Sequence, residues 1–269
     1  MAVLLVLTSC VRDHISPAFD GPAPLAILIE ENPWLWAVGA DVPSVALYAD
    51  GLLVYRDATI TNDIPFRSFR LPERELRTLC ESVGPSEAFR KLHPNLVLVD
   101  GFDFPSTKMY LSDGRTHKMV SIYGSLIDNG HIKACSSDTN IVAPNEFARV
   151  QTLLSSLSYP NAQPWVPEYF EIMIWPYDYA PNQRDWPASF PGLQDRLTVR
   201  RKKGAYSLFM KGSRKAELIE YLSKSAENEA ILIDGKKWAR SVRPVFPSEP
   251  VWRAAEKEYE NVLPKHNGM

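Results

Sequence analysis

The chain has 269 residues, with 30 Lys and Arg against 32 Asp and Glu, and a formal net charge of −2 at pH 7. Hydrophobic residues make up 45% and charged residues 23%, which is ordinary for a soluble globular protein of one large or two smaller domains. The lack of a basic surplus argues against a general nucleic-acid-binding protein. No apolar run approaches the ~20 residues that a membrane-spanning helix needs.

The first ten residues follow the pattern of a bacterial lipobox. An apolar run over residues 2–7 precedes Thr8, Ser9 and Cys10. This predicts a truncated lipoprotein signal over 1–10, with Cys10 as the lipidated first residue of the mature protein. The run is short and no Lys or Arg precedes Cys10, so a start codon further upstream would have to supply the basic region. The alternative is a short buried strand over 2–7, with Cys10 as a core thiol.

Residues 11–24 contain charged and small residues and three prolines, with little periodicity. This composition predicts a flexible tether between a membrane anchor and a folded domain.

Two cysteines remain if Cys10 carries the lipid. Cys80 and Cys135 then form an even pair, which favours a disulfide in an oxidising compartment. Such a bond would stabilise the fold by roughly 4 kcal/mol in the chain-entropy model. The alternative is two unpaired buried thiols.

An internal repeat organises residues 25–160. A strand-like run leads to Asp50-Gly51, and a second leads to Asp113-Gly114. Asp-Gly between β-rich runs indicates a hairpin with a type I′ turn, so hairpins are expected over 45–55 and 108–122. A helical pattern follows each hairpin, over 72–83 and 144–157.

Residues 161–269 predict a second subdomain, after a proline-rich boundary at 158–167. The expected elements are a strand over 169–175, a hairpin over 197–210, a helix over 213–224, a hairpin turning at Asp234-Gly235, and a C-terminal helix over 251–262. The fold class predicted for the whole chain is α+β, with antiparallel hairpins, helices packed on one side, and two subdomains.

Cys10, Tyr48-Ala49-Asp50-Gly51 and Arg243-Pro244-Val245-Phe246-Pro247 together resemble uncharacterised bacterial envelope lipoproteins. The resemblance implies a lipid-anchored protein of the cell envelope, on the periplasmic face in a Gram-negative cell. It implies no particular activity.

Motifs for metal, phosphate or nucleophilic chemistry do not stand out. The five histidines are scattered, the three cysteines match no zinc pattern, and the glycines form no phosphate loop. No metal or cofactor is therefore expected. Two aspartate pairs, Asp100 with Asp103 and Asp178 with Asp185, are the candidates for acid–base catalysis, although aspartate near a turn more commonly bonds the local backbone.

An aromatic, proline-rich segment is the best candidate for binding a partner. Its rings are Trp175, Tyr177, Tyr179 and Trp186, which offer large, rigid contact area. The alternative is that these rings cap the core between the two halves. The basic run over residues 200–203 either contacts anionic headgroups or an acidic partner protein, or forms a solvated hairpin turn.

These observations favour a non-enzymatic envelope lipoprotein that binds a protein partner in the envelope. One concrete form is an immunity-type protein that neutralises a toxin. The rival is a hydrolase of envelope glycans or lipids that uses the paired aspartates.

Overall fold

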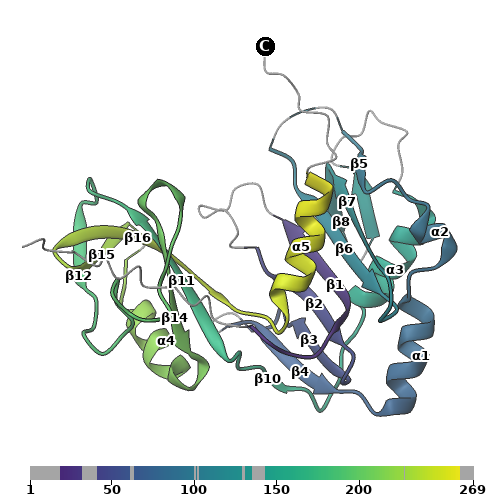
Figure 1. Cartoon of the computed structure of the whole chain (residues 1–269), viewed down its shortest axis with the longest axis horizontal. Coiled ribbons are helices and arrows are strands. Elements are labelled where there is room, and N and C mark those ends of the chain that lie inside the picture. Colours follow the sequence, from purple (N-terminus) through teal and green to yellow (C-terminus); the bar gives the residue numbers. More distant parts are fainter. Residues whose placement is uncertain are drawn as a thin grey trace, which may run out of the picture. The chain divides into compact units, whose positions relative to one another are not determined.

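A computed structural model describes residues 19–31, 41–60, 64–99, 101, 103–128, 131–134, 143–226 and 228–260 (Figure 1). The fold is α+β, as the sequence predicts. The described chain divides into two compact units. The larger unit contains the described residues of 19–170, 211–224 and 241–260, and the smaller unit contains those of 171–210 and 225–240.

An eight-stranded sheet of order β10-β4-β3-β2-β1-β6-β7-β5 forms the larger unit's centre. Only the β5–β7 pair within this sheet is parallel. The strands are β1 (Pro24–Glu31), β2 (Pro43–Tyr48), β3 (Leu52–Arg56), β4 (Phe66–Arg70), β5 (Asn95–Val97), β6 (Ser106–Ser112), β7 (His117–Tyr123) and β10 (Gln163–Pro164).

Strand β1 lies between the two predicted Asp-Gly hairpins, β2–β3 and β6–β7. Its apolar run is continuous because both faces of the strand are buried. Ala26 and Leu28 belong to the core on one face, while Ile27 and Ile29 belong to the core on the other. A strand buried on both faces shows no period-two alternation, so the sequence pattern does not indicate β1.

Three helices cover one face of this sheet: α1 (Glu73–Val83), α2 (Glu87–Arg90) and α3 (Asn145–Ser155). The predicted helices over 72–83 and 144–157 are therefore confirmed to within two residues at each end. Pro72 and Pro144 occupy the N-cap positions, where the missing proline N–H costs no intrahelical hydrogen bond.

Helix α5 (Glu249–Glu260) lies across the opposite face (Figure 1). Trp252 and Ala255 are buried there against Ile27, Ile29 and their neighbours. The expected placement of helices on one side thus holds for α1 to α3, whereas α5 covers the second face of β1.

The second sheet has six strands in the order β12-β15-β16-β11-β14-β13. Most of its residues belong to the smaller unit. Strand β12, which is parallel to β15, lies within the aromatic, proline-rich segment that ends at Trp186. The strands are β11 (Tyr169–Pro176), β12 (Asn182–Asp185), β13 (Val199–Arg200), β14 (Tyr206–Lys211), β15 (Glu229–Ile233) and β16 (Lys236–Pro244).

Four short elements and one helix complete the described chain. They are β8 (Ser125–Asp128) paired with β9 (His131–Ala134), the 3-10 turns η1 (Lys202–Gly204) and η2 (Gly212–Arg214), and α4 (Lys215–Ser223). The expected helix over 213–224 is shorter, and Ser213 is not its N-cap. No helix among the described residues is both long and apolar enough to cross a bilayer.

The type I′ turn predicted for the hairpins occurs at the third Asp-Gly pair. Asp234 (φ 51°) and Gly235 (φ 71°) both have positive φ there. At Gly51 (φ 81°) and Gly114 (φ 84°) only the glycine does. The Asp113 carboxylate instead accepts hydrogen bonds from the backbone N–H groups two and three residues on, which fixes a different turn.

The expected boundary near residue 160 is replaced by an interleaved division. The described residues from 241 onward return to the larger unit, where α5 buries Trp252 against the eight-stranded sheet. Residues 211–224 also belong to the larger unit, and the Gly212 N–H donates to the Glu168 carbonyl (2.7 Å). The end of the expected tether is also held in place. Ser248 donates from its N–H to the Phe19 carbonyl (2.8 Å) and from its hydroxyl to the Gly21 carbonyl (2.9 Å).

Candidate functional site

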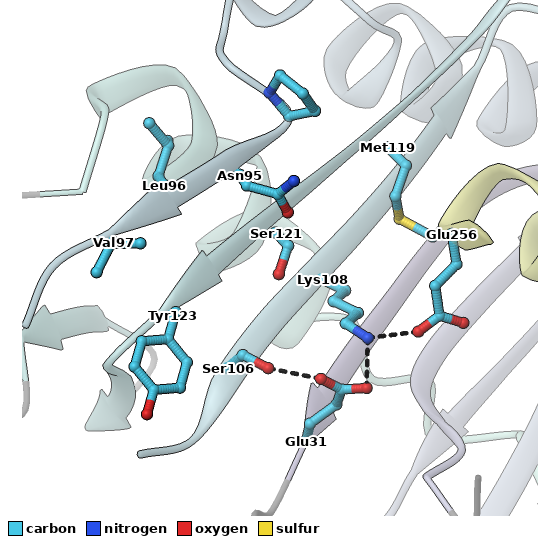
Figure 2. A pocket seen from close by; sticks show the side chains of 11 residues that line it. Glu31, Asn95, Leu96, Val97, Ser106, Lys108, Met119, Ser121, Tyr123 and Glu256 are labelled. Carbon is cyan, nitrogen blue, oxygen red and sulfur yellow. Dashed lines mark hydrogen bonds and ion pairs between the residues drawn. The ribbon is translucent and has the colours of Figure 1, made fainter. Parts of the chain in front are cut away.

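A cavity of about 310 Å³ lies in the larger unit, beside β5, β6, β7 and α5 (Figure 2). Its lining combines one ion cluster, several hydroxyl and amide groups, and an apolar part. The lining residues are Glu31, Pro94, Asn95, Leu96, Val97, Ser106, Lys108, Met119, Ser121, Tyr123 and Glu256.

Strand register arranges the floor of this cavity in two cross-strand rows. Asn95 of β5 pairs with Ser121 of β7, which pairs in turn with Lys108 of β6. Paired residues in a sheet point to the same face at a strand spacing of about 4.8 Å. The three polar side chains therefore form one row.

The second row contains Val97, Tyr123, Ser106 and Glu31, in register across β5, β7, β6 and β1. The Tyr123 hydroxyl is already engaged, because it donates to the Gly101 carbonyl (3.0 Å). Ser106 Oγ donates to Glu31 Oε2 (2.6 Å).

Lys108 joins two carboxylates at one end of the cavity. Its Nζ lies 2.6 Å from Glu31 Oε1 and also contacts Glu256 Oε1 (Figure 2). The side chains of Lys108, Glu31 and Glu256 are only 15%, 24% and 12% exposed. Charged side chains with so little exposure to water require partners of opposite charge, and each member of this cluster has such a partner.

The charge pairs continue along α5. Glu256 Oε2 lies 3.4 Å from Arg253 Nη1, and Arg253 Nε lies 3.0 Å from Glu249 Oε1. Glu249 also pairs with Arg243 Nη1 at 2.7 Å. From Glu31 to Arg243 the chain of contacts alternates three acidic and three basic groups, and its net charge is zero.

The protonation of Lys108 limits the chemistry of this cluster. Burial by itself lowers the pKa of Lys108, but the Glu256 and Glu31 carboxylates outweigh it and raise the pKa above the usual value. A protonated lysine is neither a nucleophile nor a base for Ser106. The arrangement is therefore better suited to holding a ligand than to acyl transfer.

Two polar side chains in the cavity have hydrogen-bonding groups that no other described side chain uses. Among the described residues, neither the Ser121 hydroxyl nor the Asn95 amide makes a side-chain hydrogen bond. Both lie in the row that ends at Lys108 (Figure 2). A ligand in the cavity can therefore take these hydrogen bonds without displacing a protein partner.

The sequence alone did not single out this cavity. Lys108 is 77 residues from Glu31 and 148 residues from Glu256, so no local motif relates them. The available signal was the alternation in β6, where Thr107, Met109 and Leu111 are buried on one face and Lys108 faces the other way.

The aspartates expected to act in catalysis lie outside this cavity. Asp103, Asp178 and Asp185 are exposed, and none of them lines it. Asp100 lies outside the described residues. Within the described chain, no group of three His, Cys, Asp or Glu side chains is placed to hold a metal ion.

The aromatic segment separates into a core residue and a surface pair. Trp186 is 9% exposed, and its Nε1 donates to the Pro191 carbonyl (2.9 Å). Tyr179 is 86% exposed, and its ring packs edge-on against Tyr177 at 4.8 Å between centroids. Trp175, at the end of β11, is half-buried.

Hydrogen bonds to β16 fix the turn that carries Tyr179. The Tyr177 N–H donates to the Lys237 carbonyl (3.0 Å), and Lys237 Nζ donates to the Ala180 carbonyl (2.9 Å). The Ala180 N–H closes the turn by donating to the Tyr177 carbonyl (3.1 Å). The exposed ring therefore stands on a backbone that is held at both ends.

The basic run over residues 200–203 is partly structural. Arg201 pairs with Glu171, a carboxylate buried in the second sheet, which also accepts a hydrogen bond from the Ser207 hydroxyl (2.5 Å). Lys202 and Lys203 lie on the exposed turn η1.

The three cysteines are described only in part. Cys80 is half-buried in α1, where burial, together with the charge of Glu81, raises the pKa of its thiol. Cys10 and Cys135 lie outside the described residues. Lipidation at Cys10 and a Cys80–Cys135 disulfide thus stay predictions.

Comparisons of the chain with protein-family models, with curated proteins and with solved structures return no match.

Proposed function

We propose that this protein is a lipid-anchored envelope protein that acts by binding another protein through the surface around Tyr179. The observation that carries the proposal is an almost fully exposed tyrosine ring on a turn fixed by three hydrogen bonds. The lipobox at Cys10 supports the location in the envelope.

Tyr179 has the properties of a binding anchor. Aromatic rings bury a large area with few rotatable bonds, so their immobilisation on binding costs little entropy. Because the turn is already held by β16, little backbone ordering remains to oppose association. Tyr177, packed edge-on beside it, extends the aromatic surface.

An immunity-type protein that neutralises an incoming toxin is one concrete form of this proposal. Such a protein needs a rigid recognition surface and an envelope address, and it needs no catalytic group. The rival hydrolase gains no support from its aspartates, since the three described ones are exposed.

The location is tested by fractionating cells that express the gene with its upstream codons, beside a Cys10→Ser variant. We expect the parent in the membrane fraction with acyl mass on Cys10, and the variant without acyl mass and outside that fraction. A parent that is soluble and unacylated would overturn the envelope proposal.

The binding surface is tested by placing a photo-cross-linking amino acid at position 179 in intact cells. The matched control carries the same group at Val251, which is also exposed (47%) but lies on α5. We expect a discrete protein adduct from position 179 only. Tyr179→Ala should then weaken binding to the purified partner by at least about 30-fold, as for an interface hot spot. Adducts from both positions, or from neither, would contradict the proposal.

A further inference from the structure

We propose that the cavity beside Lys108 binds one uncharged acetamido sugar unit. This inference concerns the larger unit and is independent of the binding surface around Tyr179. The argument rests on the size of the cavity, its charge balance and its unused hydrogen-bonding groups.

The size of the cavity sets the size of the ligand. At about 310 Å³ it is near the lower end of the range for small-molecule sites, roughly 300–1,000 Å³. This space suits a single sugar ring with its substituents. A longer glycan would have to extend out of the cavity into solvent.

The charge balance favours a neutral ligand. Lys108, Glu31 and Glu256 are already paired, and the contacts continue to Arg253. A charged ligand group would add an unmatched charge beside these poorly hydrated pairs, and desolvating it would oppose binding. An uncharged ligand avoids that cost.

The unused polar groups match hydroxyl and amide substituents. Asn95 and Ser121 can each donate and accept hydrogen bonds, as an acetamido group and a sugar hydroxyl also can. Lys108 has three N–H donors and uses two of them on carboxylates, which leaves one for a further acceptor. Because the three groups form one row at strand spacing, they can engage substituents on different positions of one ring.

The apolar part of the lining suits the rest of such a ligand. Pro94, Val97 and Met119 supply aliphatic surface, and Tyr123 supplies a ring. An acetamido sugar has a methyl group and C–H faces to place there. The cavity thus offers apolar contact together with a few convergent polar groups, which is the composition of a ligand site.

The direct test is titration of the full chain with N-acetylglucosamine, observed by NMR of ¹³C-methyl-labelled methionines. The Met119 signal is assigned by its loss in a Met119→Leu variant. We expect the Met119 signal to shift saturably, with a Kd of about 1–10 mM, as for a ligand with few non-hydrogen atoms. Glucosamine and glucuronate, which carry opposite charges, should bind at least tenfold more weakly.

A double variant, Asn95→Ala with Ser121→Ala, tests the contacts. The matched control is Ser68→Ala, a half-buried serine on β4 of the same sheet, away from the cavity. Unchanged methionine spectra without ligand verify that each variant folds. We expect the double variant to lose at least tenfold in affinity and the control to bind as the parent does. No saturable shift of Met119, equal binding of the charged sugars, or equal binding by the double variant would each overturn the proposal.

Discussion

Nζ of Lys108 on β6 lies 2.6 Å from Oε1 of Glu31 on the neighbouring strand β1. The same ammonium group contacts Glu256 on α5, so one lysine ties the C-terminal helix to the centre of the sheet. The cluster is poorly exposed to water, and its members depend on one another for charge compensation.

Replacing Lys108 with Met should destabilise the larger unit by about 3–5 kcal/mol, because it leaves the poorly hydrated Glu31 carboxylate without a cation and Glu256 with only its 3.4 Å contact to Arg253. Urea denaturation followed by tryptophan fluorescence measures this change, since Trp252 lies on α5. Adding Glu31→Gln and Glu256→Gln should recover part of the loss.

The matched control is Lys91→Met, which removes an exposed i,i+4 pair with Glu87 and should change stability by less than about 0.5 kcal/mol. Equal effects of the two lysine variants would contradict the buried-cluster interpretation.

Acid should weaken the fold partly through Asp57. Hydrogen bonds from the Thr59 hydroxyl, the Arg67 guanidinium and the Thr59 N–H lower the pKa of its carboxyl to about 2. A carboxyl whose folded pKa is below its unfolded value of about 3.9 stabilises the protein above that value, and the contribution is lost as pH falls from about 4 to about 2. Thermal melts of Asp57→Asn should therefore depend less on pH in this window. Thr59→Ala, which keeps the carboxyl but removes one donor, should lie between the variant and the parent. A pH profile of Asp57→Asn that superimposes on the parent's would refute this role.

Truncating two aromatic residues of one segment should change the free energy of unfolding by very different amounts. Trp186→Ala should cost about 3–5 kcal/mol, because it removes a buried ring that packs edge-on against Phe190 at 5.1 Å. Tyr179→Ala should change stability by less than about 0.5 kcal/mol, because its ring is exposed. Chemical denaturation monitored by circular dichroism compares the two variants. A large loss from Tyr179→Ala would mean that its ring supports the fold and is not kept for a partner.

Two glycines with similar backbone conformations should tolerate alanine unequally. Gly124 (φ 76°) and Gly235 (φ 71°) are both left-handed, which costs an alanine roughly 1–2 kcal/mol. A Cβ on Gly235 meets nothing within 4 Å, whereas a Cβ on Gly124 would lie 2.1 Å from Val99 Cγ2. Gly124→Ala should therefore cost about 1–3 kcal/mol more than Gly235→Ala, through overpacking. The difference in denaturation midpoint between the two variants measures the steric part alone, and equal midpoints would show that Val99 can move aside at no cost.

The sequence by itself determined the local elements with strong periodicity or turn chemistry. Apolar spacing behind Pro72 and Pro144 is enough to define α1 and α3. Asp-Gly between β-rich runs defines the hairpins, because few residues adopt positive φ without strain. These signals are contained within a dozen residues, so they can be recognised without knowing what packs against them.

Only the tertiary structure decided which distant segments meet. Strand β1 carries no alternation because it is buried on both faces, and α5 joins the larger unit although it is the last helix described. The row of Asn95, Ser121 and Lys108 exists through strand register, and Glu256 reaches Lys108 across 148 residues of chain. Charge pairing and strand register depend on contacts between segments far apart in sequence, and the local structural preferences of the residues do not determine those contacts.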